Sequence, residues 1–109
     1  MSAGPPGQFP GFAAVVIDGT VMAVLSGELD AGTQRPLTHL LRQIAQLKPE
    51  RIIFEMSQVS FVDCASMRLI AGAGLSLPEG ARPVLKDPRH MVRRVLELTG
   101  LDALCDITP

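Results

Sequence analysis

The residues of this chain that carry chemistry lie closest together in the stretch SFVDCASM, residues 60–67. A β-rich run ends there at a carboxylate, Asp63, and a helical pattern begins within two residues, with the Cys64 thiol and the Ser66 hydroxyl in its first turn. A carboxylate in that position can accept a hydrogen bond from the backbone amide of Ala65 or Ser66 and interacts favourably with the helix dipole. The free amides of a helix start also favour an anion or an acidic group of a partner. The stretch therefore predicts a capped helix start that can serve at the same time as a binding surface.

The same residues do not indicate catalysis. A nucleophilic thiol at Cys64 would need a general base within reach, and the two histidines, His39 and His90, fall in separate predicted helices. Two histidines without a carboxylate cluster do not match a metal site. The small-residue run AGAG, residues 71–74, lies inside a helical pattern, where it favours close packing over phosphate binding. We therefore expect neither enzymatic activity nor a metal or other cofactor.

Two strands, a helix and a third strand precede this stretch. Residues 13–29 contain two β-rich runs separated by Asp18 and Gly19, a pair that suits the positive φ angles of a tight hairpin turn. Large aliphatic residues then recur at helical spacing, and Pro49 ends this helix. The five residues of that apolar stripe are Leu37, Leu40, Leu41, Ile44 and Leu47. The nearly continuous apolar run at residues 51–57 predicts a strand in the middle of the sheet, covered on both faces.

The remaining sequence predicts one more strand and one more helix. Residues 81–87 indicate a strand, in which Pro83 argues against a central position. Asp87 and Pro88 are typical of a helix start, with a side-chain acceptor at the N-cap, and Gly100 fits a left-handed helix end. The final residues suit a short edge strand. The order β-β-α-β-α-β-α predicts an α/β fold, with a mixed sheet of about four to five strands opened by an antiparallel hairpin, and about three main helices.

Length and composition point to one domain. The chain has 109 residues, of which 47% are hydrophobic, enough for a single core. We assign the domain to residues 13–109 and expect the Pro- and Gly-rich residues 1–12 to form a disordered leader. The net charge of −1 and the absence of Trp and Tyr argue against direct nucleic-acid binding. The sequence shows neither a signal peptide nor an apolar run long enough for membrane insertion, and we expect a cytoplasmic protein.

Three separated segments together resemble the STAS domain of anti-sigma-factor antagonists. LSGELDAGTQRPL resembles the end of the family's second strand and the start of its first helix. RIIFEMSQVSFVDCASMRLI resembles its central strand followed by the Asp-Ser-Ser-Gly-Leu junction, and VRRVLELTGLDAL resembles its closing helix and cap. The resemblance covers residues 13–107 in the family's order, and it implies the family's small α/β fold.

The resemblance also implies a non-enzymatic role in the control of sigma-factor-dependent transcription. Antagonists of this family bind an anti-sigma factor that has a serine-kinase ATP-binding domain, and thereby free the sigma factor. Phosphorylation of the second Ser of the junction motif by that kinase switches the antagonist off. By position, the five motif residues correspond in order to Asp63, Cys64, Ala65, Ser66 and Met67. These residues are the expected partner-binding surface.

Asp30 matches the acidic residue that helps form the docking face of family members, whereas Ala65 departs from the family pattern. Ala65 has no hydroxyl, so the usual phosphoacceptor and the off-switch are missing. Ser66 points about 100° further around the helix and is a displaced candidate acceptor. Three interpretations follow: an antagonist always competent to bind, one regulated at Ser66, or a STAS-type scaffold or accessory subunit of a signalling or transport assembly without a switch. A small-molecule or nucleotide binder is a further alternative, because helix-start amides and nearby arginines can hold a phosphate.

Overall fold

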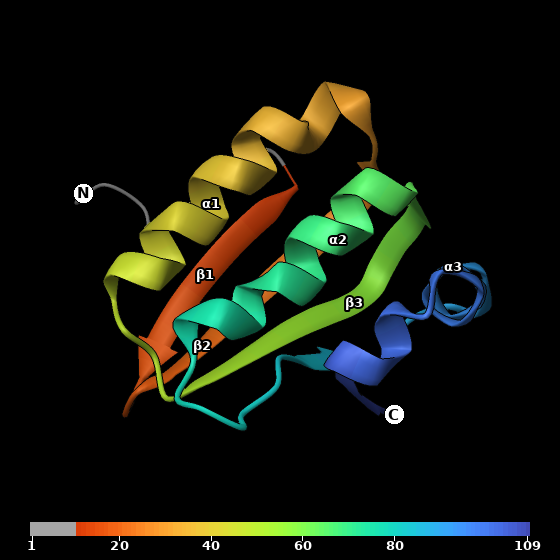
Figure 1. Cartoon of the computed structure of the whole chain (residues 1–109). Helices are drawn as coiled ribbons and strands as arrows, with labels where there is room; N and C mark the ends of the chain where they lie inside the picture. Colours follow the sequence, from red (N-terminus) through yellow and green to blue (C-terminus); the bar gives the residue numbers. More distant parts are fainter. Residues whose placement is uncertain (1–10) are drawn as a thin grey trace.

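The computed structural model of the protein describes residues 11–109 as a five-stranded sheet with helices packed against it (Figure 1). The strands lie in chain order, so each pairs with the strand that follows it. The first pair is antiparallel and the other three pairs are parallel. The strands are β1 (Phe12–Ile17), β2 (Thr20–Leu29), β3 (Arg51–Val62), β4 (Val84–Lys86) and β5 (Asp106–Thr108).

One α-helix connects each parallel pair of strands. The helices are α1 (Gln34–Gln46), α2 (Cys64–Gly72) and α3 (His90–Thr99), and the short 3-10 helices are η1 (Ala31–Thr33), η2 (Ala73–Ser76) and η3 (Leu101–Leu104). In Figure 1, α1 and α2 lie side by side across the sheet. The predicted order, the mixed sheet and the short C-terminal edge strand are therefore confirmed.

The hairpin at the start of the domain has the expected turn. Asp18 and Gly19 have φ angles of 49° and 78°, the left-handed values that a type I′ turn requires at both central residues. β1 begins at Phe12, one residue before the predicted start of the domain, and the Phe12 side chain is buried. Residues 1–10 of the predicted leader lie outside the described residues.

β3 lies in the middle of the sheet as predicted, but helices cover one of its faces and not both. Ile52, Phe54 and Met56 are fully buried, whereas Ile53 and Glu55 on the opposite face are half-buried. The reason lies in the strand order, which advances steadily in one direction. Right-handed crossovers between successive parallel strands then place all the connecting helices on the same side of the sheet.

β3 is also longer than the predicted residues 51–57, and two bulges explain the difference. Opposite β2, each irregularity adds one residue to β3. Beyond Met56 the buried side chains therefore come at three-residue intervals, at Val59 and Val62. The strict alternation that identifies a strand in a sequence stops at Met56, although the strand itself continues to the candidate site.

The apolar stripe of α1 packs against the sheet and ends before Leu47. Leu37, Leu40 and Ile44 are buried. Leu47 lies beyond the last helical residue and is 44% exposed, so it does not belong to the predicted stripe. Lys48, which follows it, has a φ of 49°, a left-handed value incompatible with a continuing helix.

The start of α3 differs from the prediction. Asp87 has a φ of 54°, and its backbone amide donates to the carbonyl of Thr108 in β5 at 2.8 Å. The helix begins at His90 and not at Pro88, and its N-cap residue, Arg89, makes no side-chain capping bond. The Arg89 Nε instead donates to the carbonyl of Ser57 in β3 at 2.8 Å. Pairing with the edge strand thus holds Asp87 in a conformation in which it does not cap the helix.

Candidate functional site

Two aspartates lie together at one edge of the sheet, where β2 and β3 end. The last residues of these parallel strands, Leu29 and Val62, are paired in register, so Asp30 and Asp63 follow at the same level. The backbone amide of Asp63 also donates to the carbonyl of Leu29 at 2.9 Å, which joins the two strand ends. Residues 33 positions apart in the sequence therefore come together at the same end of the sheet.

Asp63 caps α2 as the sequence predicts. Its backbone is extended, and its Oδ1 accepts a hydrogen bond from the amide of Ser66 at 2.7 Å. Its carbonyl accepts from the amide of Met67 at 3.0 Å, the first bond of the helix. The carboxylate therefore lies at the positive end of the helix dipole, where a negative charge is favourable.

Asp30 is held in a similar way at the start of the 3-10 helix η1. Its Oδ1 accepts from the amide of Gly32 at 2.9 Å, and its own amide donates to the Thr33 hydroxyl at 2.9 Å. In this reciprocal arrangement the Gly32 amide holds the carboxylate, and Thr33, a residue that sequence reasoning missed, holds the backbone of Asp30. The signal was present as an Asp followed three residues later by a side-chain acceptor.

The first turn of α2 divides the predicted binding residues into two groups. Cys64 and Ala65 are exposed, whereas Ser66 and Met67 are both 0% exposed. In this structure neither Ser66 nor Met67 can touch a docking partner, so the surface formed by the motif is smaller than predicted. We call Asp30, Asp63, Cys64 and Ala65 the junction surface.

The burial of Ser66 also removes its hydroxyl from the reach of a kinase. The Ser66 Oγ is enclosed and has no hydrogen-bond partner among the described residues. A kinase must bring the acceptor oxygen to its ATP, and this requires an exposed hydroxyl. The geometry therefore argues against Ser66 as a displaced phosphoacceptor, because the rotation of about 100° from Ala65 turns its side chain into the core.

The chemical alternatives gain no support from the geometry. His39 and His90 lie on α1 and α3, and within residues 11–109 no group of three or more His, Cys, Asp or Glu residues could hold a metal ion. No helix of the described part of the chain is long and apolar enough to cross a membrane. Arg93 and Arg94 line a hollow on α3 that also contains Glu97, a carboxylate that would repel an anion.

Two groups with shifted pKa values lie away from the junction surface. Hydrogen bonds from Ser57 lower the pKa of Glu55, whose Oε1 accepts from the Ser57 amide at 2.8 Å. Burial raises the pKa of the Cys105 thiol to about 11, and the neighbouring carboxylate of Asp106 adds to this effect. These shifts follow from local packing in β3 and beside β5, so they do not indicate acid–base chemistry at the junction.

Comparisons with known proteins concern the family and the fold of the chain. The STAS domain family matches residues 12–109. An anti-sigma factor antagonist from Mycobacterium paratuberculosis has a TM-score of 0.80 at 22% identity, with 90% of this chain and 84% of that chain covered. Unphosphorylated SpoIIAA, also an anti-sigma factor antagonist, has a TM-score of 0.74 at 24% identity, with 90% and 88% covered.

A protein from Thermotoga maritima classed with the same antagonists has a TM-score of 0.76 at 24% identity, with 90% of this chain and 86% of that chain covered. At these identities the likeness concerns the fold. No curated protein matches the sequence significantly.

Proposed function

This chain belongs to the STAS domain family, and from that membership we propose that it is an anti-sigma-factor antagonist that the usual phosphorylation cannot switch off. In this proposal it binds, without catalysis, an anti-sigma factor with a serine-kinase ATP-binding domain and so frees a sigma factor. The observation that carries the proposal is Ala65, an exposed residue at the start of α2 in the position of the family's phosphoacceptor.

The junction surface supports docking because it is both accessible and rigid. Asp30 and Asp63 are each fixed by a hydrogen bond from a backbone amide, at 2.9 Å and 2.7 Å. Fixed side chains lose little conformational freedom when a partner binds. Cys64 and Ala65 lie exposed beside them and leave room for a partner to approach the helix start.

The missing switch has a simple physical meaning. A phosphate on the family's acceptor adds about −1.5 to −2 charges to a surface that docks with a neutral hydroxyl. Next to Asp30 and Asp63 that charge would add repulsion and a desolvation cost, and docking would weaken. With a methyl group at Ala65 and an enclosed hydroxyl at Ser66, neither residue offers the kinase an acceptor.

The proposal is tested first by affinity capture from the lysate of the host, with ATP present and mass spectrometry of the bound proteins. We expect recovery of an ATP-binding anti-sigma factor, while the intact mass of this chain stays unchanged. The recovered partner is then purified, and its affinity is compared for the wild type, Ala65→Ser and Ala65→Glu. We expect Ala65→Ser to bind like the wild type without ATP and to gain one phosphate with ATP.

Ala65→Glu places a charge at the acceptor position and should weaken binding by roughly tenfold or more. Ala81→Glu adds the same charge at an exposed residue before β4, outside the junction surface, and should leave the affinity unaltered. The proposal fails if the captured proteins contain no anti-sigma factor, or if the wild-type chain itself gains a phosphate during incubation with the partner.

A STAS-type scaffold or accessory subunit is the second candidate, and the same two residues favour it. A chain without an accessible hydroxyl at position 65 or 66 fits a binding module that is never switched. Capture of transport or signalling subunits in place of an anti-sigma factor would support this candidate. Nucleotide binding is checked in the same samples, because a ligand that binds only the folded chain must raise its melting temperature.

A further inference from the structure

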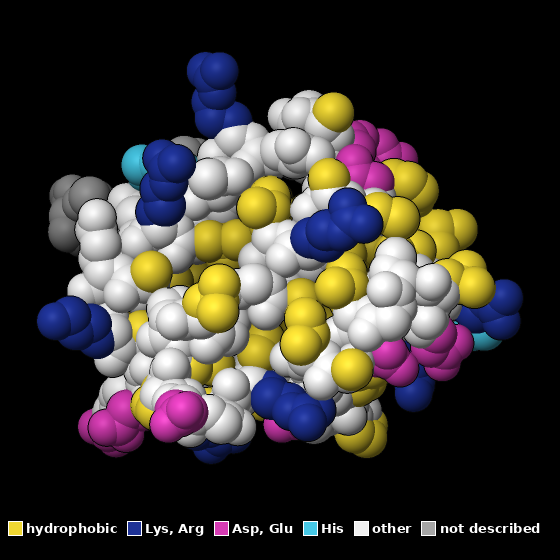
Figure 2. Space-filling model, in the orientation of Figure 1, with side chains coloured by type: hydrophobic (Ala, Val, Ile, Leu, Met, Phe, Trp, Pro, Cys, Tyr) yellow, Lys and Arg dark blue, Asp and Glu magenta, His cyan; other side chains and the backbone are white. Residues whose placement is uncertain are grey.

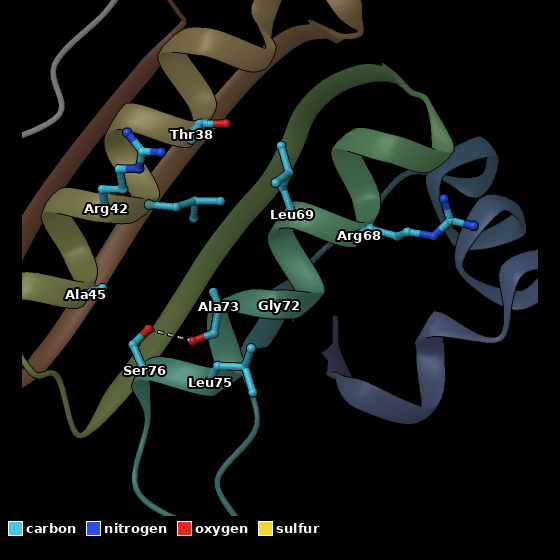
Figure 3. Close-up of a pocket in the computed structure, with 10 residues that line it drawn as sticks. Thr38, Arg42, Ala45, Arg68, Leu69, Gly72, Ala73, Leu75 and Ser76 are labelled. Atoms are coloured by element: carbon cyan, nitrogen blue, oxygen red, sulfur yellow. Dashed lines mark hydrogen bonds between the residues drawn. The ribbon is translucent and has the colours of Figure 1, made fainter.

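A groove lies between α1 and α2, apart from the junction surface. It has a volume of about 550 Å³, and none of the junction residues lines it. Leu41 of α1 and Leu69 of α2 both line it, and Figure 3 shows the Leu69 side chain projecting from α2. Both side chains are half-buried and pack against the hydrophobic core, so the floor of the groove is apolar and fixed.

Small residues keep the groove open along α2. A Cβ atom added at Gly72 would meet no atom within 4 Å, which shows open space above this residue. Leu75, just beyond Gly72, is 94% exposed. It lines both the groove and a second hollow that reaches Leu104. Figure 2 shows apolar side chains gathered along the middle of this face, with Lys and Arg side chains around them. The apolar surface thus extends beyond a single hollow.

The charged side chains of the two helices that form the groove have one sign. α1 and α2 contain Arg35, Arg42 and Arg68 but no Asp or Glu. Arg42 and Arg68 line the groove, and Figure 3 shows their guanidinium groups directed away from one another, over the outer side of each helix. Neither forms an ion pair with any residue between 11 and 109. An apolar floor thus lies between two unneutralised cations.

From these observations we propose that the groove binds an acidic amphipathic helix of a protein partner. Such a helix presents apolar anchors at helical spacing to a groove of this kind. Its anchors would lie between Leu41 and Leu69, and its flanking carboxylates would face Arg42 on one side and Arg68 on the other. The site goes beyond the proposed function, because it requires neither the junction surface nor an anti-sigma factor.

The probe is a synthetic amphipathic peptide of about four helical turns, with Leu on one face and Glu on both flanks. Its binding to the full chain is followed by fluorescence anisotropy and located by amide chemical shifts. A second peptide has Lys in place of every Glu, and a third has Ser in place of every Leu. We expect saturable binding of the Glu peptide alone, with shifts at Leu41, Leu69 and Gly72 and none at Asp30.

Two kinds of variant test the charges and the space separately. Arg42→Glu combined with Arg68→Glu should lower the affinity for the Glu peptide at least roughly tenfold. Added salt should lower the affinity of the wild-type chain toward the same level. Arg93→Glu, on α3, is the matched control and should change nothing. Gly72→Phe should block the groove, whereas Gly72→Ala should leave the affinity within roughly a factor of two, because one methyl group fits the open space.

Several outcomes would overturn the inference. They are equal binding of the Lys peptide, binding unaffected by the double Arg variant, shifts centred outside the groove, or no saturation by the Glu peptide at up to about 1 mM. Displacement of a bound peptide by a fatty acid, with the fatty acid binding more tightly, would assign the groove to an anionic lipid instead. Far-UV circular dichroism of each variant verifies that it is folded. Ala65→Glu, which tests the junction surface, should leave the binding of the Glu peptide to the groove unchanged.

Discussion

α2 and α3 both begin just after a strand and an aspartate, yet their first turns are built differently. At α2, Asp63 is extended and its Oδ1 caps the amide of Ser66 at 2.7 Å. At α3, Asp87 has a left-handed φ of 54° and makes no capping bond. The amide of Asp87 pairs with β5, and Arg89 bonds to the carbonyl of Ser57 in β3. α3 is thus anchored by neighbouring strands and α2 by its own carboxylate.

The third residue of each helix sharpens this contrast. Ser66 of α2 and Val92 of α3 occupy the same place in the first turn, and both are 0% exposed. Val92 presents only hydrocarbon to the core, whereas Ser66 buries a hydroxyl without a partner. The start of α3 is therefore well packed, whereas the buried hydroxyl of Ser66 lowers the stability of the start of α2. Such costs concentrate where function constrains a sequence.

The largest expected effect is the difference in thiol reactivity between the two regions. Cys64 opens α2 and is exposed, whereas Cys105 precedes β5, is 4% exposed and has a pKa raised to about 11. An aromatic disulfide reagent at pH 8 should modify Cys64 at least roughly 100-fold faster, because the thiolate is the reacting form. The rate is followed by absorbance, with Cys64→Ser as the control that isolates Cys105. Simultaneous modification of both thiols in the native chain would contradict this prediction.

A charge in the first turn of α2 should have very unequal effects on stability at two adjacent residues. Ser66→Asp buries an unpaired carboxylate and should lower the free energy of unfolding by roughly 3 kcal/mol or more. Ala65→Asp adds the same group on the surface, near the positive end of the helix dipole, and should change it by less than about 0.5 kcal/mol. Urea denaturation measures both values. Equal losses would mean that the two side chains do not differ in burial.

The two aspartates provide the next test. Asp63→Ala removes a helix cap and should lower the free energy of unfolding by about 1 kcal/mol. Asp87→Ala removes no cap and alters only the preference for a left-handed backbone, which should cost less than the roughly 1–2 kcal/mol that this conformation costs an ordinary residue. Both variants are compared with the wild type by urea denaturation. No loss of stability in Asp63→Ala would show that its carboxylate does not cap α2 in solution.

Removal of the enclosed hydroxyl should stabilise α2. Ser66→Ala deletes a buried polar group without a partner, and the free energy of unfolding should rise by up to about 1 kcal/mol. Ser60→Ala, on an exposed position of β3, serves as the control and should remain within about 0.5 kcal/mol of the wild type. A loss of stability in Ser66→Ala would show that the hydroxyl is hydrogen-bonded in solution.

The smallest effect concerns acid stability on the α3 side. Glu55 accepts from the amide of Ser57, and the carbonyl of Ser57 holds Arg89. Because the folded pKa of Glu55 lies below its usual 4.5, its contribution is present above pH 4.5 and disappears as the pH falls through the folded value. Glu55→Gln should therefore cost roughly 0.5 kcal/mol at neutral pH and less in acid.

Urea denaturation across the acid range measures this dependence. Glu79→Gln removes an exposed carboxylate from a turn and provides the matched control for the change in charge. If Glu55→Gln lost the same stability at every pH, the carboxylate would contribute through packing and not through its charge.

Much of the fold was predictable because it rests on local signals. Asp18 and Gly19 indicate the hairpin turn, the spacing of Leu37, Leu40 and Ile44 indicates α1, and Gly100 indicates the end of α3. Gly100 indeed has a φ of 75° at the C-cap. Each signal depends on residues within one or two turns of chain, so no knowledge of distant neighbours is required.

The length of β3 and the start of α3 could not be predicted in the same way. The bulges of β3 arise from its register with β2, and the conformation of Asp87 arises from its bond to Thr108 at the end of the chain. Both are set by partners distant in the sequence. The local alternation in β3 and the Asp-Pro pair before α3 therefore predicted a strand end and a helix start that differ from the observed ones, because tertiary contacts determine both.

At the candidate site the sequence by itself determined which groups are present: a capping carboxylate at Asp63, a second carboxylate at Asp30, and no hydroxyl at Ala65. Only the tertiary structure decided how these groups are arranged. The parallel pairing of Leu29 with Val62 brings the two carboxylates to one edge, and packing of α2 on the sheet encloses Ser66. Residue types determine which chemical groups are present. The exposure and proximity of these groups depend on which distant segments pack together, and a local pattern does not contain that information.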